Sequence, residues 1–380
     1  MCHNNDMTTD VILAQRPLGA AFVGGGFMAE VHSRAARSAR ATLVGAASSS
    51  PESARRAADR LGLTTAYDSP EALFADDAVD VVHICTPNTT HAAFALAAMD
   101  AGRHVICEKP LATSIEDAEA LVERVDATGV TATVPFVYRY HPMVREARAK
   151  VAAGELGTLL TIHGSYLQDW LLSETDDDWR VDSAVGGPSR AFADIGSHLC
   201  DLVEFVTGDR ITRVAATKRT IFSERATHRD IDTEDAVALV VETAAGAIGT
   251  LLVSQVAPGR KNRLAIEISG SAETILFDQE QPESLWLGRR AGSELLMRDP
   301  ALLSADAARL SVLPAGHPLG YQDAFNAFVA DSYAAARGEV REGLPTFADG
   351  LRAVRITAAV LESSAQGGWV DVPAYAGTVV

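Results

Sequence analysis

The feature that most constrains the fold is a regular alternation, from residue 17 to about residue 137, of short apolar runs and segments with a helical pattern. The apolar runs are residues 18–23, 42–47, 79–85, 104–107 and 131–136. The helical segments between them are roughly residues 28–39, 51–61, 70–75, 89–101 and 114–128. Strands that are apolar almost throughout are typical of a sheet covered on both faces. The alternation therefore predicts an α/β domain with a parallel, doubly wound sheet.

Beyond residue 155 the pattern changes to segments that alternate in polarity or are rich in β-branched residues. These segments are residues 158–166, 211–220, 236–242, 247–255, 263–269, 273–278 and 284–287. Short hairpin-like connections separate several of them, which predicts an α+β domain with a large, mostly antiparallel, open-faced sheet. One helix at 198–206 interrupts the strands, and two late helices, at about 321–337 and 346–366, are expected to pack back on the assembly.

The length of 380 residues suggests two domains. We predict a disordered tail over residues 1–16, a dinucleotide-binding domain over 17–138, and a domain for substrate binding and oligomerisation over 139–380. The formal charge of −17 argues against nucleic acid as a partner. We find neither a signal peptide nor an apolar stretch of about 18 residues. The four cysteines lack metal-ligand spacing and suit a reducing compartment, so we expect a cytoplasmic protein without a metal.

A glycine-rich turn follows the first apolar run and opens the first helical segment. Gly24-x-Gly26-x-x-Ala29 matches the dinucleotide fingerprint, with alanine in place of the third glycine. Gly24 allows a tight turn, and Gly26 lets a pyrophosphate approach the backbone. The positive end of the following helix, at Phe27 and Met28, favours the same phosphates.

The second apolar run ends in three serines, Ser48, Ser49 and Ser50, where an acidic residue normally binds the ribose 2′-OH of NAD. Hydroxyl groups at this place, with Arg55 or Arg56 nearby, favour the 2′-phosphate of NADP. The alternative is a serine-rich turn that also accepts NAD.

Two further sites lie at the ends of apolar runs, where ligands bind in such sheets. Thr86-Pro87-Asn88 follows one run, and His91 after it is equally well explained as a residue of the first helical turn. Lys109 follows another run, in a place where a lysine can donate or accept a proton. The alternative is an ordinary surface lysine.

Asp194 and His198 are four residues apart and therefore face the same way on a helix. An imidazole oriented by a carboxylate is a ready general base for the proton of an alcohol. The alternative is a helix-capping aspartate with a packed histidine. No third ligand is spaced for a metal ion.

These motifs, together with His32, Glu108-Lys109-Pro110 and Tyr138-Arg139-Tyr140-His141-Pro142, resemble the glucose–fructose oxidoreductase / inositol dehydrogenase (Gfo/Idh/MocA) family over essentially the whole chain after residue 16. The resemblance implies a Rossmann domain and a sheet whose far side builds dimers or tetramers. It also implies that His198 takes the hydroxyl proton while Lys109 and Asp194 hold the same oxygen and a hydride passes to nicotinamide. In relatives the bond after the lysine is often cis.

The segments Tyr166–Trp170 and Trp179-Arg180 resemble those of levoglucosan and glucoside dehydrogenases within this family. The sequence departs from many relatives at Gly186–Arg190, where Arg190 suggests a polar or anionic group on the substrate, or an ion pair with Asp194. The cofactor residues implied are Gly24, Gly26, Phe27, Met28, Ser48, Ser49, Arg55, Thr86, Pro87, Asn88, His91, Glu108 and Lys109. The substrate residues implied are Lys109, Tyr138, Arg139, Tyr166, Gln168, Asp169, Trp170, Trp179, Arg180, Arg190, Asp194 and His198.

The sequence therefore predicts an NAD(P)-dependent dehydrogenase or reductase of a sugar, polyol or glycoside. One alternative is an enzyme that keeps its cofactor tightly bound and cleaves or epimerises a glycoside through transient oxidation. Another is a non-catalytic nucleotide-binding sensor, whose mark would be loss of the residues at the positions of Lys109 or His198; both are present.

Overall fold

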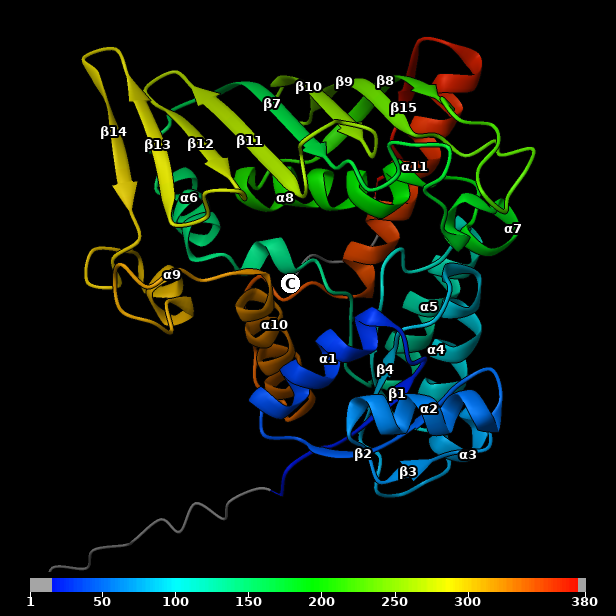
Figure 1. Cartoon of the computed structure of the whole chain (residues 1–380). Coiled ribbons are helices and arrows are strands. Elements are labelled where there is room, and N and C mark those ends of the chain that lie inside the picture. The colour runs from blue at the N-terminus through cyan, green and yellow to red at the C-terminus, as the bar shows by residue number, and fades with distance from the viewer. Residues whose placement is uncertain (1–15, 375–380) are drawn as a thin grey trace, which may run out of the picture.

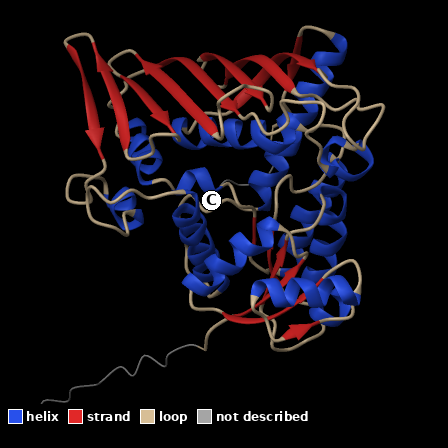
Figure 2. Ribbon diagram, viewed as in Figure 1, coloured by secondary structure: helices blue, strands red, loops and turns tan. Residues whose placement is uncertain are grey.

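The computed structural model describes residues 16–374, which form two sheets with helices around them (Figures 1 and 2). The first sheet has six strands in the order β3-β2-β1-β4-β5-β6, and every neighbouring pair is parallel. Its strands are β1 Gly19–Val23, β2 Thr42–Ala47, β3 Thr65–Ala66, β4 Val81–Ile84, β5 His104–Cys107 and β6 Ala132–Thr133. The predicted doubly wound sheet is confirmed. Apart from Arg16, the expected tail lies outside the described residues.

The helices of this part follow the capping signals of the sequence. They are α1 Phe27–Ser38, α2 Pro51–Leu61, α3 Pro70–Phe74, α4 His91–Asp100 and α5 Ile115–Thr128. Ser50, Ser69 and Ser114 each cap a helix by accepting a hydrogen bond from the backbone three residues on. Helices α2 and α5 end at Gly62 and Gly129, both in the left-handed conformation that glycine adopts without strain. These signals determine where each helix begins and ends, and therefore where the next strand can start.

The second sheet has nine strands in the order β14-β13-β12-β11-β7-β10-β9-β8-β15. Its strands are β7 Leu159–Leu167, β8 Ile211–Arg219, β9 Ala236–Thr243, β10 Ile248–Ser254, β11 Arg263–Gly270, β12 Thr274–Asp278, β13 Ser284–Arg289, β14 Gly292–Met297 and β15 Trp369–Asp371. β7 and β10 are parallel, and the other neighbours are antiparallel. The predicted mostly antiparallel sheet is confirmed.

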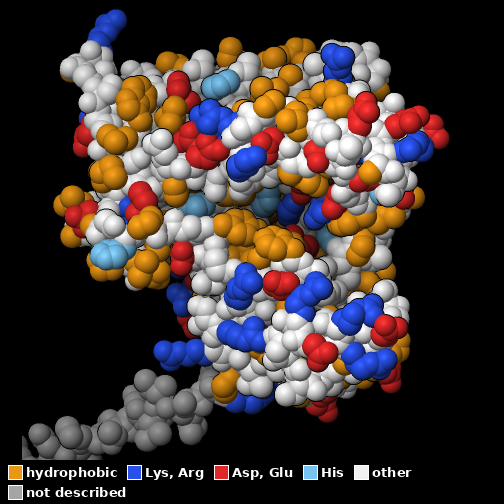
Figure 3. All heavy atoms as spheres, in the orientation of Figure 1, with side chains coloured by type: hydrophobic (Ala, Val, Ile, Leu, Met, Phe, Trp, Pro, Cys, Tyr) orange, Lys and Arg blue, Asp and Glu red, His pale blue; other side chains and the backbone are white. Residues whose placement is uncertain are grey.

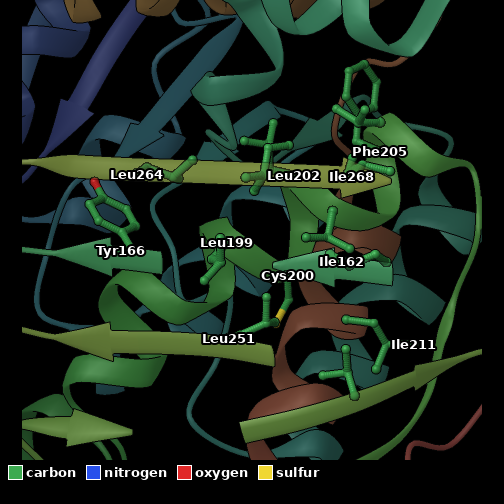
Figure 4. Packing of buried hydrophobic residues seen from close by; sticks show 14 of the residues in the cluster. Ile162, Tyr166, Leu199, Cys200, Leu202, Phe205, Ile211, Leu251, Leu264 and Ile268 are labelled. Atoms are coloured by element: carbon green, nitrogen blue, oxygen red, sulfur yellow. The ribbon is translucent and has the colours of Figure 1, made fainter. Parts of the chain in front are cut away.

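Helices cover one face of this sheet. α8 (Ser197–Thr207), α6 (Pro142–Ala152) and α11 (Phe347–Gln366) lie beneath it in Figure 1. Figure 4 shows Leu199 and Leu202 of α8 among side chains from β7, β8, β10 and β11. A Cβ atom on Gly164 of β7 would come within 2.8 Å of Leu251 and 3.0 Å of Leu199, so the helix packs closely on the strand. The position of α8 in turn fixes the side chains at its beginning.

The opposite face of the sheet has no helix on it in Figure 1. Along β10 buried and exposed residues alternate, so that Ile248 and Leu252 point away from the helices. Val240 of β9 and Trp286 of β13 are exposed as well. This outer face is therefore partly apolar.

The late helices belong to the cores of the first sheet as well. α10 (Tyr321–Ala336) packs against α1, and α11 packs against α5. Several elements were not predicted from the sequence, among them α6, α7 (Ser183–Gly186), α9 (Ala305–Leu310), β3, β14 and β15. β3 and β15 are only two and three residues long, too short for a pattern. The residues of β14 are nearly all exposed, and its apolar residues Leu295–Met297 are consecutive and do not alternate with polar ones.

Candidate active site

A cleft of about 1250 Å³ lies where the carboxyl ends of β1, β4 and β5 face the second sheet. Figure 3 shows the surface hollowed between the two parts of the molecule. The cleft brings together most residues expected from the sequence. They are Gly24, Gly26, Phe27, Met28, Ser48, Ser49, Thr86, Pro87, Asn88, His91, Glu108, Lys109, Tyr138, Tyr166, Gln168, Trp170, Trp179, Arg180, Asp194 and His198.

The glycine-rich turn fits a dinucleotide. Gly24 has a φ of +101°, and a Cβ atom there would lie 2.4 Å from the carbonyl oxygen of Cys85. Only glycine is compatible with this turn. A Cβ atom on Gly26, in contrast, would enter open space in the cleft, with nothing within 4 Å. The turn therefore leaves room for a phosphate directly at the amino end of α1.

The serine turn after β2 reaches the cleft through Ser48 and Ser49, whereas Ser50 caps α2. Arg55 is exposed on α2 and does not line the cleft. The structure thus brings the hydroxyl groups, but not this guanidinium, to the cleft.

His91 connects the two loops that carry the cleft. Its buried ring lies between the carbonyl oxygens of Pro110, 2.7 Å from Nδ1, and of Thr86, 2.9 Å from Nε2. The Lys109–Pro110 bond is cis. Asn88 donates a hydrogen bond of 2.8 Å to the carbonyl oxygen of Gly186 in the other part of the chain. These contacts fix the loops after β4 and β5 relative to each other and to the segment at Gly186.

Lys109 and Asp194 form an ion pair at the centre of the cleft. Lys109 Nζ donates to Asp194 Oδ1 at 2.6 Å and to the Asp194 carbonyl oxygen at 2.9 Å. Gln255 Nε2 donates to the other carboxylate oxygen at 2.8 Å, and Arg180 Nε lies 4.0 Å from Oδ1. Burial acts to raise the pKa of Asp194, but Lys109 and Arg180 bring it down to about 2. The carboxylate is therefore ionised and holds the ammonium group in place.

His198 lies in the first turn of α8, beside this pair. Its ring packs edge-on against Phe136 and Tyr138, with centroids 5.5 Å and 5.1 Å apart. Burial, and then the charge of Lys109, lower the pKa of His198 to about 3. The imidazole is therefore neutral near pH 7 and able to accept a proton.

The expected pairing of Asp194 with His198 is replaced by another arrangement. Asp194 lies in a π-helical turn, Phe192–Gly196, that precedes α8, and its carboxylate bonds Lys109 and Gln255. The i, i+4 spacing of an α-helix does not apply across this wider turn. Within residues 16–374, His198 Nδ1 is buried without a hydrogen-bond partner.

Aromatic and amide side chains form the wall opposite the glycine turn. Tyr166 Oη and Gln168 Nε2 donate to Asn262 Oδ1 at 2.7 and 2.8 Å, and Asn262 Nδ2 donates to Tyr138 Oη at 3.0 Å. Trp170 Nε1 donates to Gln168 Oε1 at 2.8 Å. The network leaves ring faces and polar atoms on one surface, a combination that suits a hydroxylated ring with C–H faces.

Arg139 and Arg190, expected at the substrate, lie outside the cleft. Arg139 is buried in ion pairs with Asp201 and Asp349. Arg190 is paired with Asp235, not with Asp194. A guanidinium removed from water needs carboxylate partners. Both arginines have such partners inside the protein, so they do not contact the cleft.

Asp169 is also displaced from the expected role. It accepts hydrogen bonds from Lys261 Nζ at 2.7 Å and from the Gly259 backbone at 3.0 Å, and it does not line the cleft. It holds Lys261, which does line it.

Sequence reasoning missed several residues that the fold brings to the cleft. They are Phe94, Pro135, Asp178, Lys261, Asn262 and Tyr321, together with Gln255 behind Asp194. Asp178 directly precedes the motif Trp179-Arg180, so the sequence could have indicated it. The others lie on connections or helix ends that carry no motif, so only the topology reveals them.

Within residues 16–374, no group of three His, Cys, Asp or Glu side chains is arranged to hold a metal ion. In the same residues, no helix is long and apolar enough to cross a membrane.

A Rossmann sheet with a phosphate-binding turn, facing a lysine and a neutral histidine, defines a nicotinamide-dependent oxidoreductase. Models of the "Oxidoreductase family, NAD-binding Rossmann fold" and of the "GFO/IDH/MocA C-terminal domain" match residues 18–136 and 144–276. The chain belongs to the GFO/IDH/MocA oxidoreductase family.

Characterised relatives include levoglucosan dehydrogenase of Pseudarthrobacter phenanthrenivorans, 31% identical over 94% of this chain and 98% of the relative. A solved complex of levoglucosan dehydrogenase with NADH and levoglucosan has a TM-score of 0.87, is 31% identical, and covers 94% of this chain and 100% of that one. An oxidoreductase domain protein from Kribbella flavida has a TM-score of 0.87 at 34% identity, with 94% and 100% covered. A D-xylose 1-dehydrogenase (NADP(+)) of Haloferax volcanii is 38% identical over 40% of this chain and 46% of its own length.

Proposed function

We propose that this chain oxidises a secondary alcohol of a neutral sugar, polyol or glycoside with NAD or NADP, or catalyses the reverse reduction. The observation that carries the proposal is the position of Lys109 and His198 in the same cleft as the glycine turn. Levoglucosan, inositol and xylose dehydrogenases among the relatives support this substrate class.

When bound, nicotinamide accepts or supplies the hydride. The backbone from Gly24 to Phe27 would hold its phosphates, and Ser48 and Ser49 its adenosine ribose. His198 accepts the hydroxyl proton as a neutral base, and Lys109 donates a hydrogen bond to the same oxygen. Asp194, fixed by Gln255, keeps the Lys109 ammonium group aimed at that oxygen.

The charges of the substrate half favour a neutral ligand. Three cationic side chains line it, and each has a carboxylate partner: Lys109 with Asp194, Arg180 with Asp178, and Lys261 with Asp169. An anionic sugar would have to compete with these carboxylates. Hydroxyl groups instead add hydrogen bonds to pairs that stay neutral overall.

For the cofactor, we propose weak discrimination with NADP still accepted. The serine turn lacks the carboxylate that repels a 2′-phosphate. Arg55 is exposed and does not line the cleft, which argues against a strong preference for NADP. NADH in the levoglucosan dehydrogenase complex and the NADP named for xylose dehydrogenases support use of both.

We further propose a cytoplasmic homodimer or homotetramer, divided into a dinucleotide-binding domain over residues 17–138 and a substrate and oligomerisation domain over 139–380. The partly apolar outer face of the second sheet supports the oligomer.

The test is a screen of neutral polyols, monosaccharides and glycosides that follows the absorbance of reduced cofactor, with NAD and NADP in separate assays. We expect steady turnover of free cofactor with at least one neutral substrate. Conversion of a glycoside without net change in free cofactor would favour the alternative enzyme with a tightly bound cofactor. No conversion, together with binding of NAD or NADP, would favour a sensor.

A further inference from the structure

A buried chain of hydrogen bonds runs from α10 to the cleft through side chains that have no role in the reaction above. Tyr333 Oη lies 2.7 Å from His83 Nε2, and His83 Nδ1 lies 2.8 Å from His32 Nδ1. His32 Nε2 lies 3.0 Å from Glu108 Oε1. His32 and His83 are 0% exposed and Tyr333 is 2% exposed, so water does not compete for these bonds.

One arrangement of protons satisfies the whole chain when Glu108 is a carboxylate and both imidazoles are neutral. The carboxylate accepts from His32 Nε2–H, which leaves the lone pair of His32 on Nδ1. That nitrogen accepts from His83 Nδ1–H, and His83 Nε2 then accepts from the Tyr333 hydroxyl. Each bond donates towards Glu108. The carboxylate, which can only accept, selects the tautomers of both rings, and Tyr333 completes the arrangement by donating to His83 Nε2.

The electrostatics agree with this order. Burial raises the pKa of the Tyr333 phenol, which therefore stays a donor. Burial, and then His32, lower the pKa of His83 well below its usual value, so its ring is neutral. Burial acts to raise the pKa of Glu108, but the hydrogen bond from His32, and then the charge of Lys109, bring it below its ordinary value.

Other titratable or charged groups face Glu108 from the elements around it. They are Cys85 after β4, His91 of α4, Cys107 and Lys109 on either side, Arg180, His198 of α8 and Tyr321 of α10. Among the described residues, only His32 donates a side-chain hydrogen bond to the carboxylate of Glu108. The chain is therefore the contact that specifically fixes this carboxylate.

We propose that Tyr333, His83 and His32 are positioning residues that hold Glu108 as an oriented carboxylate in the wall of the active-site cleft. The proposal rests on the function proposed above, because Glu108 acts there through its neighbour. Its Oε2 accepts the backbone N–H of Lys109 at 3.1 Å. The chain thereby fixes the start of the segment that carries the catalytic ammonium group and keeps a negative charge beside it.

Tyr333→Phe removes only the first donor of the chain. Without it, His83 Nε2 is left buried without a donor, which weakens the hydrogen bonds that His83 and His32 donate in turn towards Glu108. We expect the protonation midpoint of Glu108, followed by infrared absorption of its carboxyl group in cofactor-free protein, to rise by roughly half a pH unit or more, the scale of one hydrogen bond. The acid limb of the kcat profile should shift the same way, with little change in KM for the sugar.

Tyr140→Phe is the matched control, because Tyr140 is buried in the same core and its hydroxyl has no hydrogen-bond partner among the described residues. It should move neither the infrared midpoint nor the pH profile. Glu108→Gln identifies the infrared band, and in that background Tyr333→Phe should have no further effect on the kcat profile. His32→Leu, which removes the donor to Glu108 directly, should raise the midpoint and serves if Tyr333→Phe does not fold.

An unchanged Glu108 midpoint in Tyr333→Phe or His32→Leu would overturn the proposal, and so would additive effects of Tyr333→Phe and Glu108→Gln on kcat. The infrared titration needs neither cofactor nor substrate. A wild-type protein that turns over no sugar would therefore refute the proposed function. The Glu108 midpoints of the variants would still show whether the hydrogen-bond chain holds this carboxylate.

Discussion

At the residue scale, the two groups that we propose to bind the substrate oxygen are held in place to different degrees. Lys109 is held by Asp194 through two hydrogen bonds. Within residues 16–374, His198 Nδ1 has no hydrogen-bond partner, and its ring is held by packing against Phe136 and Tyr138. Lys109→Ala and His198→Ala should each lower kcat roughly a hundredfold or more, the scale of positioned acid–base catalysis. Cofactor affinity, measured by fluorescence titration, should change little, because in the proposed function the backbone of the glycine turn binds the phosphates. Lys150→Ala, at the far end of α6, is the control; near-normal kcat in either cleft variant would refute the assignment.

The serine turn gives a second prediction at this scale. Ser48→Asp adds a carboxylate that binds the 2′-OH of NAD and repels the 2′-phosphate of NADP. We expect the ratio of kcat/KM for NAD to that for NADP to rise at least about tenfold, or about 1.4 kcal/mol. Arg55→Ala, on exposed α2, should leave the ratio unchanged. If Arg55→Ala alone abolished the use of NADP, the exposed guanidinium would be the binding group after all.

At the scale of elements, the segment that carries Trp170, Trp179 and Arg180 depends on the connection between β8 and β9. Asp177 in that segment accepts hydrogen bonds from the backbone and hydroxyl of Thr227 and from His228. Asp177→Ala should therefore loosen the segment and raise KM for the sugar roughly tenfold or more, with a smaller effect on kcat. Steady-state kinetics and proteolysis of the segment measure this. Glu224→Ala is the control, because Glu224 is exposed on the same connection. An unchanged KM in Asp177→Ala would show that the hydrogen bonds of Asp177 are not needed to position the segment.

The same scale shows what the sequence predicts well. Buried parallel strands such as β1 and β4 are apolar throughout, and helices such as α2 have capping signals. The local sequence pattern is therefore enough to predict these elements. Arg139 was misassigned because its partner Asp201 lies 62 residues away, and a lone sequence does not reveal such a pairing. Asn262 was missed for the same reason, since its bonds to Tyr138 and Gln168 exist only once three distant segments meet.

At the scale of the whole molecule, we expect the outer face of the nine-stranded sheet to mediate the proposed assembly. Leu252 points outward on β10, whereas its neighbour Leu251 is buried on the face of the sheet that packs against α8. We expect a dimer or tetramer by light scattering at micromolar concentration, and Leu252→Glu should weaken it while leaving the fold intact. Thr250→Glu, on the same strand and face, is a milder charged comparison. A wild-type monomer would contradict the expectation.

Buried histidines set the response of the whole molecule to acid. Burial lowers the pKa of His141 to about 4 and of His198 to about 3, and His83 and His91 shift in the same direction. In the unfolded chain these groups titrate near pH 6.5, so as the pH falls from about 6.5 to 4 the unfolded chain binds protons that the folded chain does not.

Stability should therefore fall across that window. Asp201 acts in the opposite sense, because burial raises its pKa to about 6 and the folded chain gains a proton there. It is one group against these four histidines and His104, whose pKa burial also lowers. We expect the free energy of unfolding, from urea titrations, to drop by at least about 1 kcal/mol between pH 7.5 and pH 5. His141→Gln, which removes one buried imidazole, should flatten the dependence even if it lowers stability at pH 7.5. Equal stability at both pH values would mean that these rings gain protons in the folded state, and the neutral His198 on which proton transfer depends would have to be abandoned.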